Sequence, residues 1–148
     1  MCGILGELSL NNNLASIEEF KKILNLSKNR GPNETRIETL GKKNRFGFNR
    51  LSILDLSEKA SQPIWSPSRR YIIVFNGEIY NHQKLRLKLG GFAKNIQSNS
   101  DSVSLAYSIE KWGIKTTINK LEGMFAIGVW DRKKKCLTLA RDFAGIKP

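Results

Sequence analysis

The stretch Met1-Cys2-Gly3-Ile4 opens the chain, and the rest of the sequence can be interpreted around it. If an aminopeptidase removes Met1, Cys2 becomes the N-terminus and carries both a thiol and a free α-amine. A thiolate attacks where a thiol hardly does, so a nearby group has to accept the thiol proton. An α-amine titrates at about 7.7–8.0, much closer to neutral pH than a lysine amine at about 10.4, which makes it a suitable general base. The stretch is compatible with an N-terminal cysteine nucleophile, although taken alone it favours a second residue with no catalytic role; the motifs below strengthen the catalytic interpretation.

Composition indicates one globular domain. The chain has 148 residues, of which 40% are hydrophobic and 26% charged, enough for a sizeable core. No apolar run approaches the roughly 18 residues of a membrane span, and the N-terminus lacks the pattern of a signal peptide. We therefore expect a cytoplasmic protein with no membrane partner. Cys2 and Cys136 form neither a disulfide framework nor a zinc pattern, and Cys136 is predicted to be a small buried core residue.

The formal net charge of +12 raises the question of an anionic partner. The basic residues are spread along the chain, however, and the densest runs, at 42–43 and 132–135, fall where hairpin turns are expected. No aromatic residue alternates with them in the sequence, as a stacking platform for bases would require. We therefore expect basic, solvated turns and no nucleic-acid partner.

Hydrophobic periodicity predicts strands and helices of ordinary length. The expected strands cover residues 3–10, 36–40, 45–49, 71–75, 124–130 and 136–140. The expected helices cover residues 17–27, behind a capping box formed by Ser16 and Glu19, then 81–89, a segment starting after Ser100, and a short segment near 114–121. The 71–75 run is continuously apolar, which indicates a strand buried on both faces. The pattern predicts an α+β domain with mostly antiparallel sheets.

The dipeptide Asn76-Gly77 has two interpretations. Asn-Gly between strands is a strong signal for a tight hairpin turn, and the dipeptide alone favours that structure. Alternatively, the Asn76 side-chain amide and the Gly77 backbone N–H could both donate to the oxyanion that forms when an amide is attacked.

Three charged residues beside apolar segments suit an α-amino acid ligand. Arg50 offers a bidentate clamp for a carboxylate, and Glu78 and Asp101 could hold an ammonium group, although each alone is more often a surface charge. His82 is the sole histidine and would have to serve in any Cys–His pair, but a surface or capping role is favoured. We expect no metal site, because no cluster has the required spacing, and no phosphate-binding loop is present.

Taken in order, these motifs resemble the N-terminal glutaminase domain of glutamine-dependent asparagine synthetases. That group belongs to the class II glutamine amidotransferases, among the N-terminal nucleophile hydrolases. The segments that carry the resemblance are Met1-Cys2-Gly3-Ile4-Leu5-Gly6, Arg30-Gly31-Pro32, Arg50-Leu51-Ser52-Ile53-Leu54-Asp55-Leu56, Gln62-Pro63, Asn76-Gly77-Glu78-Ile79-Tyr80-Asn81, Ser100-Asp101, Glu122-Gly123-Met124-Phe125-Ala126, Leu139-Ala140-Arg141-Asp142 and Gly145-Ile146-Lys147-Pro148. Each is weak alone, but nine in order with compatible spacing are specific.

The resemblance implies a four-layer αββα sandwich with two mainly antiparallel sheets. It also implies that Cys2 attacks the side-chain amide of glutamine, releasing ammonia and then glutamate through a γ-glutamyl thioester. The implied site residues are Asn76 and Gly77 for the oxyanion hole, Arg50 for the substrate carboxylate, and Glu78 and Asp101 for the substrate ammonium.

The resemblance further implies that residues 1–148 are a glutaminase domain without a cofactor. An ATP- and Mg-dependent synthetase domain would follow Pro148 and use the ammonia. Two positions depart from the family pattern: Asn33 stands where Asp is usual, and Phe48 where His is frequent. A non-catalytic glutamine-sensing or interaction domain, with Met1 retained, is the alternative function.

Overall fold

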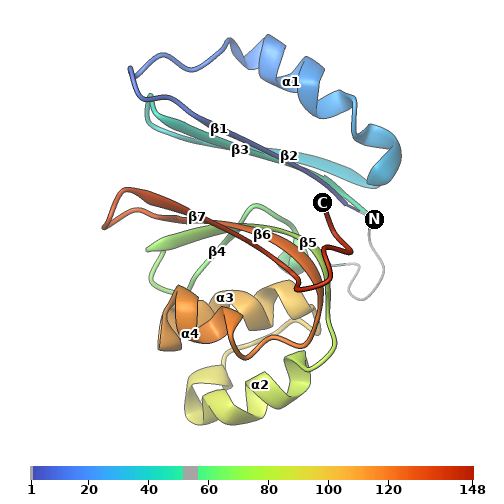
Figure 1. The fold of residues 1–148 in the computed structure, drawn as a ribbon, viewed down its shortest axis with the longest axis vertical. Helices are drawn as coiled ribbons and strands as arrows, with labels where there is room; N and C mark the ends of the chain where they lie inside the picture. The colour runs from blue at the N-terminus through green and yellow to red at the C-terminus, as the bar shows by residue number, and fades with distance from the viewer. Residues whose placement is uncertain (1, 52–56) are drawn as a thin grey trace.

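A computed structural model describes residues 2–51 and 57–148, which form two antiparallel sheets with helices on both outer faces (Figure 1). The first sheet has the order β1-β3-β2, with β1 at Gly3–Leu8, β3 at Asn44–Arg50 and β2 at Glu34–Leu40. The second has the order β4-β5-β6-β7, from Ile64–Trp65, Tyr71–Ile79, Gly123–Asp131 and Cys136–Arg141. Helix α1 (Ile17–Asn25) covers the first sheet, while α2 (His82–Leu89), α3 (Asp101–Trp112) and α4 (Ile114–Ile118) lie outside the second. Short 3-10 turns occur at Lys28–Arg30, Glu58–Ala60 and Gly90–Ala93. The predicted α+β sandwich of four layers is confirmed.

Helix α1 begins at the predicted capping box. The Ser16 hydroxyl accepts the Glu19 N–H at 3.1 Å, and the Glu19 carboxylate accepts the Ser16 N–H at 2.9 Å. The helix buries Phe20 and Leu24 against the first sheet. At Gly47 of β3 a Cβ would approach the Leu24 side chain to 2.8 Å, so the glycine allows this close packing.

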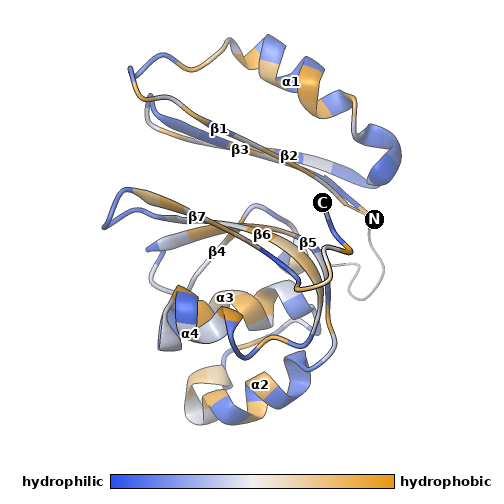
Figure 2. Cartoon of the chain, in the orientation of Figure 1, coloured by the Kyte–Doolittle hydropathy of each residue, from blue (hydrophilic) through white to orange (hydrophobic). Residues whose placement is uncertain are grey.

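Alternation along β5 divides its side chains between two layers. Tyr71, Ile73 and Phe75 join the cluster that packs against α3, whereas Ile72 and Val74 join a second cluster toward the first sheet. Figure 2 shows hydrophobic residues concentrated in β5, β6 and α3. The prediction of a strand buried on both faces is confirmed.

The favoured hairpin turn at Asn76-Gly77 is wrong. Strand β5 runs through both residues to Ile79, with Asn76 opposite Ala126 of β6 and Gly77 opposite Phe125. A Cβ on Gly77 would lie 2.1 Å from the Met124 carbonyl oxygen, so a close strand approach, and no turn, requires the glycine.

The structure also bears on the predictions for the basic turns, for Cys136 and for membrane spans. The basic runs at 42–43 and 132–135 lie in the β2–β3 and β6–β7 turns, as expected. Cys136 is exposed, contrary to prediction, because its apolar stretch is the edge strand β7. Met1 and residues 52–56 of the Arg50–Leu56 motif lie outside the described residues. Within the described residues, no helix is long and apolar enough to cross a membrane.

Candidate active site

The predicted site residues come from four elements that meet at one end of the sandwich. Cys2 precedes β1, Arg50 ends β3, Asn76, Gly77 and Glu78 lie in the last part of β5, and Asp101 begins α3. Figure 1 shows the start of β1, the end of β3 and the last part of β5 at the same end of the molecule. Strand β5 also contacts both β1 and β3.

Side-chain alternation directs the first-sheet residues toward the second sheet. Ile4 lies on the inner face of β1, packed against the cluster between the sheets, and Cys2 is two residues before it. On β3, Phe46 belongs to the same inner cluster, and Arg50 shares its parity. Cys2 and Arg50 are therefore on the inner side of the first sheet.

The same alternation places the β5 residues on the facing side. Val74 belongs to the cluster between the sheets, and Asn76 and Glu78 share its parity. Cys2, Arg50, Asn76 and Glu78 thus face the space between the two sheets at the end where these strands meet.

The Cys2 thiol is half-buried and held by backbone. Its sulfur accepts the Leu51 N–H at 3.4 Å and lies 3.8 Å from the Leu51 carbonyl oxygen. The Arg30 Nε donates to the Cys2 carbonyl oxygen at 3.3 Å. Because Leu51 follows Arg50 directly, the contact fixes the thiol next to the residue predicted to bind the substrate carboxylate.

Arg50 is buried, with 6% of its surface exposed, and its charge is compensated locally. Its Nη1 donates to Ser61 Oγ at 2.9 Å and to Glu34 Oε2 at 3.3 Å, and Ser61 Oγ also donates to Glu34 Oε2. Glu34 stands directly opposite Arg50 in the β2–β3 pair. Burial acts to raise the pKa of Glu34, but hydrogen bonds from Ser61 and Arg50, with the charge of Arg36, hold that pKa below its ordinary value. Glu34 is therefore ionised at neutral pH.

Gln62 holds the backbone just before Asn76. The Phe75 N–H donates to Gln62 Oε1 at 2.6 Å, and Gln62 Nε2 donates to the Phe75 carbonyl oxygen at 3.1 Å. Strand β4 pairs with β5 only at Ile64 and Trp65, so the Gln62 side chain extends the hydrogen bonding further along β5. Asn76 itself is 5% exposed, and none of the described residues hydrogen-bonds to its side-chain amide. A nearly buried amide to which no described residue hydrogen-bonds is available to a ligand.

The two carboxylates predicted to bind an ammonium group differ in burial. Glu78 is exposed, whereas Asp101 is buried and accepts the Ile79 N–H at 3.0 Å and the Ser102 N–H at 2.8 Å. Burial raises the pKa of Asp101, although those two backbone hydrogen bonds act in the opposite direction. A cation beside Asp101 would favour its ionised form, so ammonium binding and ionisation would support each other.

His82 lies at the start of α2, half-buried, with its Nδ1 3.4 Å from Ser104 Oγ. Burial lowers the pKa of His82, and the negative charge of Asp101 only partly offsets this, so the ring is neutral near pH 7. Within the described part of the chain His82 makes no hydrogen bond to Cys2. The Cys–His alternative gains no support.

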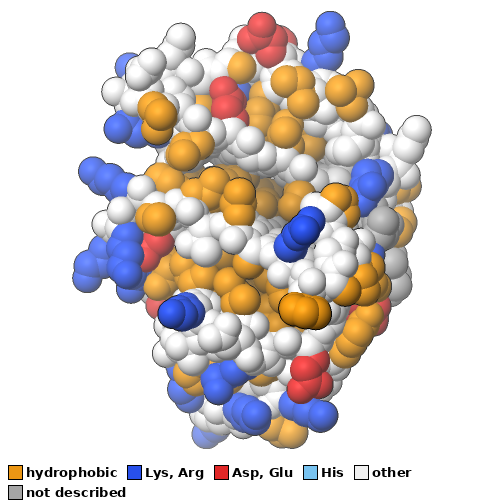
Figure 3. Space-filling view, viewed as in Figure 1, with side chains coloured by type: hydrophobic (Ala, Val, Ile, Leu, Met, Phe, Trp, Pro, Cys, Tyr) orange, Lys and Arg blue, Asp and Glu red, His pale blue; other side chains and the backbone are white. Residues whose placement is uncertain are grey.

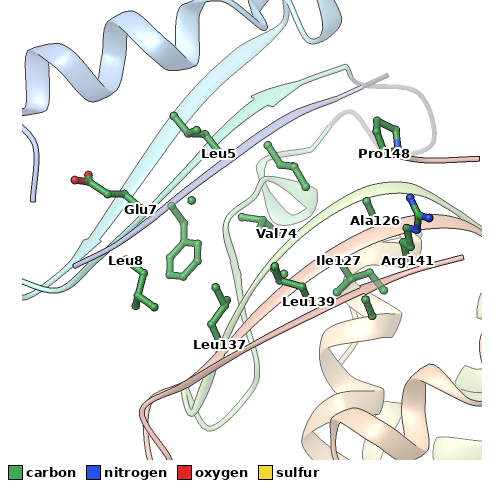
Figure 4. Close-up of a pocket in the computed structure, with 15 residues that line it drawn as sticks. Leu5, Glu7, Leu8, Val74, Ala126, Ile127, Leu137, Leu139, Arg141 and Pro148 are labelled. Atoms are coloured by element: carbon green, nitrogen blue, oxygen red, sulfur yellow. The ribbon is translucent and has the colours of Figure 1, made fainter. Parts of the chain in front are cut away.

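A cavity of about 470 Å³ opens between the sheets. Figure 3 shows hydrophobic side chains in this hollow, and Figure 4 shows Leu8 of β1 and Leu137 and Leu139 of β7 among its walls. Its charged lining residues are Glu7 and Arg141, and none of the six predicted site residues lines it. Apolar walls do not suit a zwitterionic amino acid, so this cavity is not the substrate site.

Three residues near the site were not assigned roles from the sequence: Glu34, Ser61 and Gln62. Gln62 belongs to a motif of the resemblance, but its contact with Phe75 depends on the fold. The departures from the family pattern lie nearby: the Asn33 N–H donates to the Arg50 carbonyl oxygen at 3.0 Å, and Phe48 is buried in β3.

The remaining binding predictions concern metals and nucleic acid. Among the described residues, no group of three His, Cys, Asp or Glu side chains could hold a metal ion. The expectation of no nucleic-acid partner stays a prediction. The fold does bring one aromatic ring to a basic turn: the Trp65 ring lies 4.7 Å from the Arg69 guanidinium and 5.5 Å from that of Arg132. The contact joins two turns that are distant in the sequence, so it could not be inferred from the order of basic and aromatic residues along the chain.

Comparisons with known proteins show the family and the fold of the chain. Residues 1–148 match the family model described as a glutamine amidotransferase domain. The whole chain aligns with asparagine synthetase B [glutamine-hydrolyzing] of Escherichia coli at 35% identity, covering 26% of that protein. It also aligns with asparagine synthetase [glutamine-hydrolyzing] 1 of Bacillus subtilis at 36% identity, covering 23% of it. The chain thus spans about a quarter of the length of these curated relatives. Among solved structures, glutamine phosphoribosylpyrophosphate amidotransferase from B. subtilis superposes over 99% of this chain and 32% of its own, with a TM-score of 0.60 and 19% identity, which supports the fold.

Proposed function

The chain belongs to the glutamine amidotransferase domain family, and from this we propose that it hydrolyses glutamine through a thioester on Cys2. The observation that carries the proposal is the convergence of a half-buried thiol, a buried arginine and a nearly buried asparagine amide from facing sheets. An α-amino acid with a side-chain amide offers a matching carboxylate, ammonium and carbonyl group.

Each of the three polar groups of the substrate meets protein groups of opposite charge or complementary hydrogen bonding. Arg50 receives the substrate carboxylate, since a guanidinium can donate two parallel hydrogen bonds to it. Asp101 and Glu78 receive the ammonium. The Asn76 side-chain amide and the Gly77 N–H donate to the carbonyl oxygen as it becomes an oxyanion.

The chemical step begins after removal of Met1, when the Cys2 α-amine is basic. The amine takes the thiol proton, and the sulfur attacks the amide carbon to give a tetrahedral oxyanion. The intermediate collapses, the carbon–nitrogen bond breaks, and the amine returns the proton to the leaving group, which departs as ammonia. Water then attacks the thioester, with the amine accepting its proton, to release glutamate and regenerate the thiol.

The use of the ammonia is part of the same proposal. The curated relatives are named glutamine-hydrolysing asparagine synthetases and are about four times as long as this chain. We infer that the full-length protein carries an ATP- and Mg-dependent synthetase domain after Pro148 that receives the ammonia, with no cofactor in residues 1–148. Both cysteines are free, which fits a reducing, cytoplasmic location.

Glutamate release from glutamine by the full-length protein tests the proposal. Cys2→Ala should abolish release while leaving the circular dichroism spectrum unchanged, and Cys2→Ser should retain glutamine binding but lose most of the rate. Cys136→Ala is the matched control, because Cys136 is exposed, and should retain the activity. Undiminished turnover in Cys2→Ala would refute the proposed function.

A further inference from the structure

Glu34, to which the sequence assigned no role, contacts the guanidinium of Arg50. The predicted carboxylate-binding arginine, Arg50, already faces a carboxylate that belongs to the protein itself. One oxygen of Glu34 accepts from both Arg50 and Ser61, and the other contacts Arg36. The Glu34 side chain is 27% exposed, so it lies at the boundary between the buried arginine and solvent.

This arrangement has two opposite effects on a substrate carboxylate. The contacts of Glu34 and Ser61 fix the position of the Arg50 guanidinium, which lowers the cost of ordering it when a ligand binds. The negative charge of Glu34 also repels a second carboxylate brought to the same guanidinium and reduces the net attraction that Arg50 exerts.

From these contacts, and resting on the proposed function, we infer that Glu34 is a positioning residue whose charge limits the affinity of the site for carboxylates. A ligand that carries only a carboxylate then binds more weakly, because Glu34, which also contacts Arg36, offsets part of the positive charge of Arg50. A ligand with both carboxylate and ammonium groups gains the second contact at Glu78 and Asp101. Glu34 thereby favours α-amino acids over simple carboxylates and keeps glutamine binding from being tight.

The test uses Glu34→Gln in the full-length protein, which removes the charge and retains an oxygen for Arg50 and Ser61. The KM for glutamine should fall roughly three- to tenfold, the size expected from removing a nearby like charge, with kcat little changed. Inhibition by 4-carbamoylbutanoate, which is glutamine without its amine, should strengthen by a similar factor. Inhibition by 4-aminobutanamide, which lacks the α-carboxylate, should not change.

Two further variants separate charge from position. Glu38→Gln removes a charge from the same face of β2 and serves as the matched control, so its KM should equal that of the wild type. Ser61→Ala keeps the charge but removes a contact that fixes Arg50, so the KM should rise roughly two- to fivefold, the value of one hydrogen bond, with kcat unchanged.

The outcomes distinguish this inference from the proposed function. If wild-type protein releases glutamate but the KM of Glu34→Gln equals the KM of Glu38→Gln and of the wild type, the inference is wrong and the proposed function stands. Equal strengthening of inhibition by 4-aminobutanamide would also overturn it, since the effect would not then act through the α-carboxylate. If wild-type protein that has lost Met1 releases no glutamate, the proposed function is wrong, and the inference that rests on it is wrong as well.

Discussion

Replacing Gln62 with alanine tests whether the backbone before Asn76 is held by a side chain. Gln62 is 5% exposed and Phe75 is 3% exposed, so the substitution leaves a buried N–H and a buried carbonyl group without their partner. Each unsatisfied buried group costs about 1–3 kcal/mol, and water entering the vacated space would recover part of this. We therefore expect local opening of β5 to become about 2–4 kcal/mol easier.

Hydrogen exchange of the β5 peptides in the full-length protein measures this effect. Since 1.4 kcal/mol corresponds to a factor of ten, exchange around Phe75 should accelerate roughly 30- to 700-fold. Turnover should fall by about tenfold or more, because Asn76 is the next residue and small displacements of an oxyanion donor are costly. Gln83→Ala, at an exposed position on α2, should change neither quantity. Unchanged exchange at Phe75 in Gln62→Ala would refute the positional role of Gln62.

Three more substitutions probe the site and the fold. Asn76→Ala should lower kcat by about 10²–10³ in glutamate release while KM changes little, because the amide acts on the oxyanion and not on the ground state; an unchanged kcat would exclude that role. Gly77→Ala should destabilise β5 by about 1–3 kcal/mol or more, measured by exchange, since its Cβ would lie 2.1 Å from the Met124 oxygen; normal exchange would contradict the close strand approach. Hydrogen bonds from Arg70 hold the pKa of Asp131 below its ordinary value of 3.8. The ionised Asp131 therefore stabilises the fold above about pH 3.8, and this stabilisation is lost as the pH falls through the lower pKa of the folded state. Exchange protection near the β6–β7 turn should thus be lower in Asp131→Asn than in wild type at pH 7, and the difference should shrink below about pH 4; a difference independent of pH would contradict the assignment.

Most of the helices and strands could be predicted because hydrophobic spacing determines which faces are buried, whereas the four layers were implied by the family resemblance. The capping box at Ser16, the run at 71–75 and the hairpin near 132–135 depend on residues close together in the sequence, and all three are present. The prediction at Asn76-Gly77 failed because glycine serves two purposes: it permits a turn, and it permits close backbone approach. Only the position of β6, set by distant residues, decides between them.

The sequence suggests candidate residues for the site but not the contacts that support them. Cys2, Arg50 and Asn76 carry chemistry that their residue types suggest. The contacts of Glu34 with Arg50 follow from the β2–β3 register, and those of Gln62 with Phe75 follow from the end of a two-residue strand. Neither register nor strand length can be obtained from the residues involved. Cys136 shows the same limit, because an alternating apolar segment fits an edge strand as well as a core strand.

The account depends most on Cys2 being the N-terminal nucleophile for glutamine. Intact-mass spectrometry of the full-length protein, before and after treatment with an electrophilic glutamine analogue and followed by peptide mapping, tests this directly. The account predicts a mass without Met1 and a single adduct on Cys2 that excess glutamine prevents. Protein that has lost Met1 and yet forms no adduct on Cys2, or an adduct on Cys136 instead, would contradict it.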